Sequence, residues 1–89
     1  MNWRIDTSKD AEKFFEKNQF TRKEAYDLIG KAIHYFQGER INVDIRKLKG
    51  QWTGFYRIRK GRLRIIAELD FENSAVFIEK TDWRENIYK

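Results

Sequence analysis

The feature that most constrains the fold is the segment GFYRIRKGRLRII (54–66), where apolar and basic residues alternate on both sides of a glycine. Alternation with a period of two is typical of a β-strand that buries one face. Two such runs separated by a short stretch containing glycine are typical of a hairpin. The segment therefore predicts two antiparallel strands joined by a turn of two residues, Lys60 and Gly61.

The predicted hairpin separates two kinds of side chain onto opposite faces of the sheet. The side chains that face a core would be Tyr56, Ile58, Leu63 and Ile65. The side chains that face away would be arginines, with Arg59 opposite Arg62 and Arg57 opposite Arg64. Like charges opposite one another destabilise a sheet by up to about 1 kcal/mol per pair. Two such pairs predict a bound polyanion, the alternative being a merely solvated face.

The positive charge of the chain is concentrated around this hairpin. Residues 46–64 contain eight Lys or Arg and no Asp or Glu, whereas the other 70 residues have a net charge of −3. A focused basic patch indicates a polyanionic partner more strongly than overall basicity does. Arginine matches phosphate oxygens with its planar fork and can stack on bases, so RNA is the predicted ligand.

A short strand at 2–6 and a helix are predicted at the start of the chain. Ser8, or Thr7 with Asp10, would cap this helix, which would end near Asn18. Its buried face would consist of Ala11, Phe14 and Phe15.

A second helix is predicted from a capping box of Thr21 and Glu24, after a linker at 18–20. Gly38 is the expected C-terminal stop. The core face of this helix would consist of Ala25, Leu28, Ile29, Ala32, Ile33 and Phe36.

Three strands are predicted after an extended, irregular stretch at 40–50, and they cover 52–59, 62–70 and 75–81. The two helices would pack on one face of this antiparallel sheet, leaving its other face open. The predicted fold is thus a small α+β sandwich, a single domain over residues 1–89. Trp3 and Trp52 are expected to be aromatic residues of the core or its edge.

The composition excludes several kinds of site. The chain has no cysteine and one histidine, His34, so it lacks the ligands for a zinc site, and no metal or cofactor is expected. His34 lies off the predicted core face and is expected at the surface. The absence of cysteine suits a reducing compartment, and neither a membrane-spanning run nor a signal peptide is apparent. A cytoplasmic protein is therefore predicted.

Two stretches, KLKGQWTGFYRIRKGRLRIIAEL (47–69) and the C-terminal WRENIYK (83–89), resemble the RelE/ParE superfamily of bacterial toxins from type II toxin–antitoxin modules. The order of strand, two helices, basic loop, three-stranded meander and terminal tyrosine is also similar, so the resemblance covers nearly the whole chain. It implies the RelE-like activity, a metal-independent endoribonuclease that cuts mRNA on the ribosome and so inhibits translation.

The resemblance implies roles for individual residues. In RelE-like toxins the 2′-hydroxyl of the RNA attacks the neighbouring phosphate, basic side chains stabilise the developing negative charge, and a C-terminal tyrosine assists proton transfer. The positions that match these catalytic groups are Arg57, Arg59, Arg64, Arg84 and Tyr88. Further RNA-binding residues are expected in the same basic segment, namely Arg46, Lys47, Lys49, Lys60 and Arg62.

Two positions depart from the family pattern. Trp83 occupies a position where members often carry histidine, and Asp82 replaces a second basic residue. Glu68, with the same strand parity as Arg64, is an alternative candidate for the base. The alternative function is therefore a ParE-like inhibitor of DNA gyrase or a non-catalytic nucleic-acid-binding module. The resemblance also implies two partners, a cognate antitoxin protein and mRNA on the ribosome.

Overall fold

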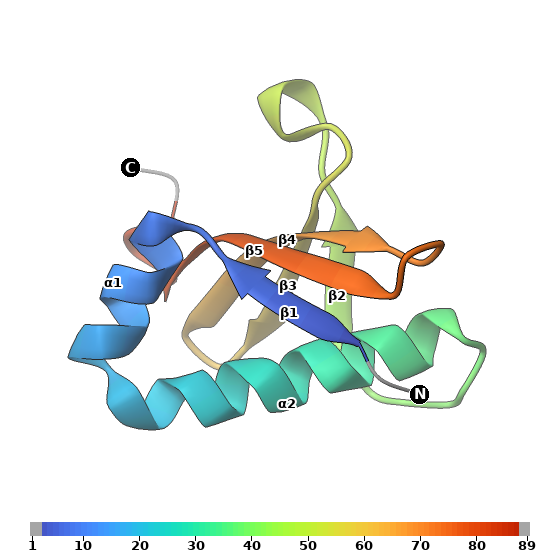
Figure 1. Cartoon of the computed structure of the whole chain (residues 1–89), viewed down its shortest axis with the longest axis horizontal. Helices are drawn as coiled ribbons and strands as arrows, with labels where there is room; N and C mark the ends of the chain where they lie inside the picture. Colours follow the sequence, from blue (N-terminus) through green and yellow to red (C-terminus); the bar gives the residue numbers. More distant parts are fainter. Residues whose placement is uncertain (1–2, 88–89) are drawn as a thin grey trace.

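Two helices lie on one face of a five-stranded sheet (Figure 1), in a computed structural model that describes residues 3–87. Across the sheet the strands follow the order β1-β5-β4-β3-β2. Strand β1 runs parallel to β5, and the other neighbouring strands are antiparallel. The elements in chain order are β1 (Arg4–Thr7), α1 (Lys9–Lys17), α2 (Gln19–Phe36), β2 (Asp44–Lys47), the 3-10 turn η1 (Gly50–Trp52), β3 (Tyr56–Lys60), β4 (Leu63–Asp70) and β5 (Ala75–Trp83).

The predicted α+β class is confirmed, with a sheet that is mixed because β1 joins it parallel to β5. The core lies between the helices and one face of the sheet. Completely buried side chains from both layers meet there, among them Phe15, Ile29, Ile58, Ile65 and Ile78. No helix in the described part of the chain is both long and apolar enough to cross a membrane.

The first helix agrees with its prediction, and the start of the second does not. The hydroxyl of Ser8 accepts a hydrogen bond from the N–H of Ala11 at 3.1 Å, which makes Ser8 the N-cap of α1. Helix α2 begins at Gln19, so the capping box at Thr21 is wrong and Asn18 alone separates the helices. The reason is that Asn18 ends α1 and also begins α2. Its backbone N–H and its side-chain amide donate to the carbonyl of Phe14, and its own carbonyl accepts from the N–H of Thr21. Thr21 itself is buried inside the helix.

The hairpin forms with a turn one residue later than predicted. Lys60 pairs with Leu63 and Arg59 with Arg64, so Gly61 and Arg62 are the two turn residues. The first turn position requires a positive φ, and Gly61 adopts one of 60°. The shift changes the cross-strand partners but keeps the alternation within each strand.

The residues that precede the hairpin form a strand that the sequence analysis missed. Positions 44–47, predicted to be extended but irregular, are the edge strand β2, which pairs with β3. Strand β3 begins at Tyr56 rather than at 52. Trp3 packs against the core as predicted, whereas Trp52 lies in η1, outside the core cluster, so its placement in the core is wrong.

The second face of the sheet is partly covered, although an open face was predicted. Ile66 shares the parity of Arg64, and both are buried; Ile87 of the C-terminal turn is buried too. Neither isoleucine belongs to the core cluster between the helices and the sheet. The backbone N–H of Arg84 donates to the carbonyl of Arg62 at 2.7 Å, which ties the C-terminal turn to the hairpin. The second face therefore carries buried side chains, and the C-terminal turn contributes a buried residue outside the main core.

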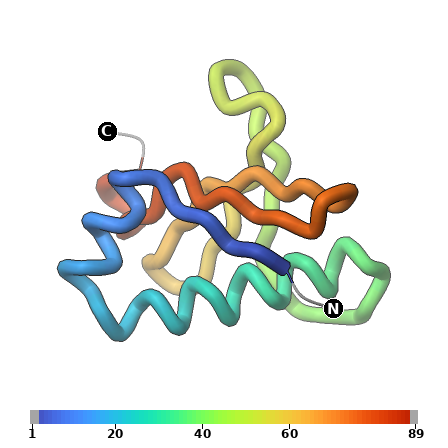
Figure 2. The backbone as a smooth tube through the Cα atoms, viewed as in Figure 1, coloured from blue at the N-terminus to red at the C-terminus, as the bar shows by residue number. Residues whose placement is uncertain are grey.

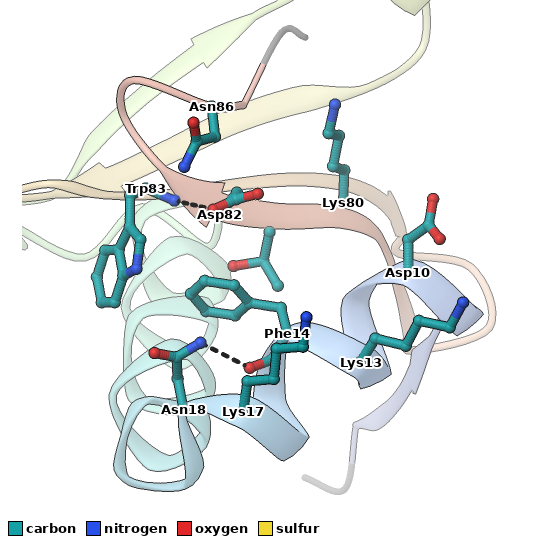
Figure 3. A pocket seen from close by; sticks show the side chains of 10 residues that line it. Asp10, Lys13, Phe14, Lys17, Asn18, Lys80, Asp82, Trp83 and Asn86 are labelled. Atoms are coloured by element: carbon teal, nitrogen blue, oxygen red, sulfur yellow. Dashed lines mark hydrogen bonds between the residues drawn. The ribbon is translucent and has the colours of Figure 1, made fainter.

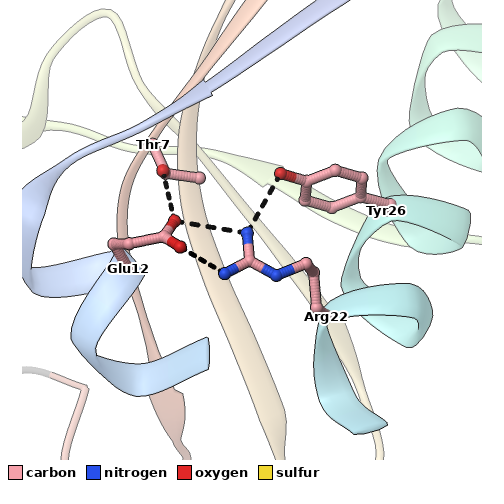
Figure 4. A network of polar contacts seen from close by, with 4 residues as sticks. All are labelled: Thr7, Glu12, Arg22 and Tyr26. Carbon is pink, nitrogen blue, oxygen red and sulfur yellow. Dashed lines mark hydrogen bonds and ion pairs between the residues drawn. The ribbon is translucent and has the colours of Figure 1, made fainter. Parts of the chain in front are cut away.

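A polar network joins β1 to both helices (Figure 4). The Glu12 carboxylate accepts from the Thr7 hydroxyl at 2.9 Å and from both terminal nitrogens of Arg22. Arg22 also reaches the hydroxyl of Tyr26 at 3.5 Å and lies over the ring of Phe15, 4.9 Å from its centroid. The hydrogen bonds from Arg22 and then from Thr7 lower the pKa of Glu12. The network fixes the angle between the two helices at the edge of the core.

Glu12→Gln tests this network. At pH 7 we expect a lower melting temperature, because Arg22 loses its anionic partner. Since folding lowers the pKa of Glu12, its contribution is complete above the ordinary pKa of 4.5 and is lost as the pH falls through the lower folded value. Melting curves followed by circular dichroism should therefore converge in acid. Glu16→Gln, exposed on the same helix, is the control; a pH-independent difference for Glu12→Gln would contradict the prediction.

Candidate nucleic-acid interface

Four arginines from three neighbouring strands share the second face of the sheet, and we name them the arginine face: Arg46, Arg57, Arg59 and Arg64. Arg46 lies opposite Arg57, and Arg59 lies opposite Arg64. The sequence predicted two like-charged pairs with other partners; the one-residue shift of the turn is the cause. The like-charged arrangement itself is present, and it disfavours the sheet unless an anion compensates it.

Arg64 is the buried member of the arginine face. The residue is 6% exposed, and its Nη1 donates to the carbonyls of Gly61 at 2.6 Å and of Leu63 at 3.1 Å. Burial lowers its pKa, and the neighbouring charges of Arg59, Arg57 and Arg84 lower it further. An arginine in such surroundings stays protonated at neutral pH. The hairpin therefore holds a fixed positive charge that the neighbouring cations destabilise.

Asp44 on the edge strand β2 balances part of this charge. Its carboxylate forms an ion pair with Nε of Arg59 and lies 3.8 Å from Nη2 of Arg57. The hydrogen bond from Arg59, followed by the charges of Arg59, Arg57 and Arg64, lowers the pKa of Asp44. Sequence reasoning missed this residue, because only the pairing of β2 with β3 places residue 44 opposite residue 59.

Arg57 retains an unused hydrogen-bond donor. Its side chain is 14% exposed, and its buried Nε finds no acceptor among the described residues. Buried polar groups are nearly always hydrogen-bonded. Because this Nε is itself buried, an anion on the arginine face would meet the terminal nitrogens of Arg57 rather than this N–H.

The C-terminal turn brings one more predicted residue to the arginine face and leaves others away from it. The charge of Arg84 acts on Arg64, which places the two near one another. Arg62, by contrast, pairs with Glu85 and lies over the ring of Trp83, 5.6 Å from its centroid. Tyr88 falls outside the described residues.

The remaining predicted RNA-binding residues are lysines exposed at the two ends of β2 and β3. Lys47 ends β2, and Lys49 follows it in the loop. Lys60 ends β3 beside the hairpin turn, at the opposite end of the ladder. The structure thus distributes these three charges around the arginine face rather than within it.

The carboxylate of Glu68 and the imidazole of His34 lie away from Arg64. Glu68 follows Arg64 by four residues along β4, a separation of about 13 Å at the usual strand rise. His34 is on α2, which covers the other face of the sheet, and is exposed next to Glu39 as the surface position predicted for it. Neither group can reach a phosphate held by Arg64.

A groove runs beside α1, at the edge of the second half of β5 (Figure 3). It has a volume of about 520 Å³, and Phe14 and Trp83 form its apolar wall with ring centroids 5.3 Å apart. Lys13, Lys17 and Lys80 line it together with polar and acidic groups. No group of three His, Cys, Asp or Glu side chains that could hold a metal ion occurs between residues 3 and 87.

Solved structures similar to this chain include RelE proteins from toxin–antitoxin complexes. The chain aligns with the RelE–RelB complex of Pyrococcus horikoshii at 26% identity and a TM-score of 0.63, covering 97% of this chain and 99% of that one. A metal-bound toxin from Helicobacter pylori gives 20% identity and a TM-score of 0.68, with coverage of 94% and 97%. The toxin–antitoxin complex RelBE2 of Mycobacterium tuberculosis aligns at 17% identity and a TM-score of 0.66. The alignment covers 94% of this chain and 100% of that one.

These similarities confirm the resemblance to RelE-like toxins at the level of the fold. No family model matches the sequence, and no curated protein matches it either.

Asp44→Asn tests whether the carboxylate holds the arginines back from a polyanion. Removing its charge leaves Arg59 and Arg57 available to phosphates. We expect tighter RNA binding and a salt dependence whose log–log slope steepens by about 0.7 for each arginine released. A labelled oligonucleotide titrated at several salt concentrations measures both.

Asp27→Asn, exposed on α2, changes the net charge equally and is the control for long-range electrostatics. Equal slopes in the two variants would show that Asp44 does not act on the arginine face.

Proposed function

We propose that this protein is the toxin of a toxin–antitoxin system and that it cleaves mRNA bound to the ribosome. The arginine face is the observation that carries the proposal: a buried Arg64 is fixed by backbone carbonyls among Arg59, Arg57 and Arg84. Fixed positive charge aimed at a phosphate is the chief requirement for stabilising a phosphoryl transition state. The likeness to RelE-like toxin structures supports the same conclusion.

The proposed reaction is a transesterification within the RNA. The 2′-oxygen of one nucleotide forms a bond with the adjacent phosphorus, and the bond from that phosphorus to the 5′-oxygen of the next nucleotide breaks. The products are a 2′,3′-cyclic phosphate and a 5′-hydroxyl. One proton leaves the 2′-hydroxyl and one reaches the departing 5′-oxygen, so the step needs no oxidant or metal.

The surroundings of each residue indicate its role in this reaction. Arg64 and Arg57 would hold the non-bridging phosphate oxygens, because both side chains are largely shielded from water and Arg64 is fixed by two backbone carbonyls. Arg59 would join them when the phosphate displaces Asp44, and Arg84 would add charge from the C-terminal turn. Tyr88 would handle a proton, as the matching tyrosine does in the family.

The shortage of acid–base groups favours dependence on the ribosome. Neither His34 nor Glu68 can reach the proposed phosphate, and Trp83 replaces the histidine often found before Arg84. Alignment of the 2′-hydroxyl with the phosphate must then supply much of the rate. A ribosome-bound mRNA has its backbone held in place, so we expect weak activity on naked RNA.

The same shortage supports the alternative function. A ParE-like gyrase inhibitor or a non-catalytic nucleic-acid-binding module would use the arginine face for binding only. Asp82, opposite Arg64 in the ladder between β4 and β5, introduces negative charge where some RelE-like nucleases carry a second basic residue. A binder would tolerate this charge better than a nuclease would.

A cognate antitoxin is the proposed protein partner. We expect the neighbouring reading frame to encode a small protein with an acidic, helix-rich segment that lies over the helices or the arginine face and orders on binding. Co-expression should suppress toxicity, and the purified complex should lose RNA affinity. Lys13→Glu with Lys17→Glu should weaken the complex if the segment enters the groove beside α1, whereas Lys23→Glu on α2 is the control. A missing or strongly basic neighbour would contradict this partner.

Tyr88→Phe decides between nuclease and binder. If the hydroxyl moves a proton only in the transition state, cleavage on translating ribosomes should fall at least about tenfold, with ribosome affinity unchanged. Primer extension on the mRNA after in vitro translation measures cleavage, and sedimentation with ribosomes measures affinity. Tyr35→Phe, exposed on α2, is the matched control. If wild type stops growth without cutting mRNA and blocks DNA supercoiling, the gyrase alternative replaces the nuclease.

A further inference from the structure

The segment between β2 and β3, residues 48–55, extends away from the body of the protein as an arm. Figures 1 and 2 show it in yellow-green, clear of the helices and of β5. It holds three large apolar residues, Leu48, Trp52 and Phe55, none of which packs against the core cluster. Trp52 and Phe55 instead pack edge to face, with ring centroids 5.7 Å apart. We name residues 48–55 the aromatic arm.

The aromatic arm has a defined conformation of its own. Leu48 donates its N–H to the carbonyl of Phe55 at 3.0 Å, and Phe55 donates to Trp52 at 3.0 Å. Two glycines with positive φ, Gly50 at 66° and Gly54 at 96°, bend the chain on either side of Trp52. Internal hydrogen bonds and fixed bends preorganise the indole, so a ligand that packs on it would order little additional chain.

The arm continues the arginine face. The Leu48–Phe55 hydrogen bond extends the β2–β3 ladder by one step beyond Lys47 and Tyr56. By strand alternation, residues 48 and 55 share the face of Arg46 and Arg57. Phe55 lies four residues from Arg59, about 13 Å along the strand at the usual rise. A polymer bound to the arginine face can therefore reach the arm without leaving the surface.

The charge around the arm selects the kind of polymer. Arg46, Lys47 and Lys49 surround its base, and no acidic residue occurs anywhere from 46 to 64. Exposed lysines next to a half-buried indole match the two requirements for binding unpaired nucleic acid, backbone neutralisation and base stacking. Stacking needs only the π-face of a base, so it adds affinity without requiring a sequence.

We propose that the aromatic arm is a second RNA-binding site, which stacks an unpaired base on Trp52 while Arg46 and Lys49 contact the flanking phosphates. This inference depends on the proposed function in one respect, namely that RNA is the ligand of the arginine face. The base that it stacks lies beyond the phosphate held by Arg64, so the arm adds affinity and takes no part in bond breaking.

Trp52→Ala tests the stacking interaction. We expect about tenfold weaker binding of a short fluorescein-labelled oligouridine, measured by anisotropy, since stacked bases contribute on this scale. Trp52→Phe should restore most of the affinity. The salt slope should be unchanged in Trp52→Ala, because stacking releases no counterions. Arg46→Gln with Lys49→Gln should instead lower the slope by about 0.7 for each phosphate that is no longer neutralised.

Phe20→Ala controls for loss of an exposed aromatic ring, since Phe20 is 95% exposed at the α1–α2 junction and belongs to neither RNA surface. Thermal melting checks that Trp52→Ala folds, which we expect because Trp52 lies outside the core. Wild-type RNA affinity in a folded Trp52→Ala protein would overturn the proposal.

Trp52→Ala could instead bind RNA normally but no longer be neutralised by a co-expressed antitoxin. The arm would then be a protein-docking surface, and the proposal would likewise fail. Binding is measured on uncut RNA, so absence of ribosomal cleavage would refute the proposed nuclease without affecting this result.

Discussion

The burial of one guanidinium group on the central strand is the constraint on which the rest of this structure depends. Strand β4 is buried on both faces along residues 63–67, and Arg64 lies within that stretch. A buried charge is costly unless its hydrogen bonds are made, and here two carbonyls of the hairpin accept them. The turn must therefore form at Gly61 and Arg62 for Arg64 to be accommodated at all. The hairpin register, the closing C-terminal turn and the electrostatics of the face follow from this placement.

The same placement explains why Asp44 matters. Three further guanidinium groups lie near Arg64, and their mutual repulsion works against folding. A permanent set of acids would relieve the repulsion and also abolish phosphate binding. The chain instead supplies one carboxylate, on an exposed edge strand, that engages Arg59 closely and Arg57 at longer range. In the proposed function a phosphate would take the place of this carboxylate, and the single carboxylate neutralises only part of the charge of the arginine face.

The parts that sequence reasoning predicted correctly are those governed by local periodicity. The alternation of Ile58 and Ile65 with arginines fixes the two faces of the sheet whatever the turn, and Ser8 caps α1 through residues three positions away. Edge strand β2 was missed because its hydrogen bonds come from β3, across a loop, and its own residues are mostly exposed. Asp44 could not be assigned to the site for the same reason. The burial of Ile66, on the face predicted to be open, likewise depends on packing that periodicity does not encode.

The second face has two regions, the surroundings of Arg64 and the aromatic arm, and they differ in how closely they are connected to the core. Arg64 is hydrogen-bonded to the turn and feels the charges of Arg59, Arg57 and Arg84, so a substitution of Arg64 would alter the hairpin and the charge of the arginine face together. The aromatic arm, held by its own hydrogen bonds and outside the core, can change its side chains without disturbing that centre. A fold organised in this way can keep one phosphate-binding arrangement while its arm adapts to different surroundings. In the proposed scheme, the arm residues that add affinity for RNA are thus distinct from the arginines that would act on the phosphate.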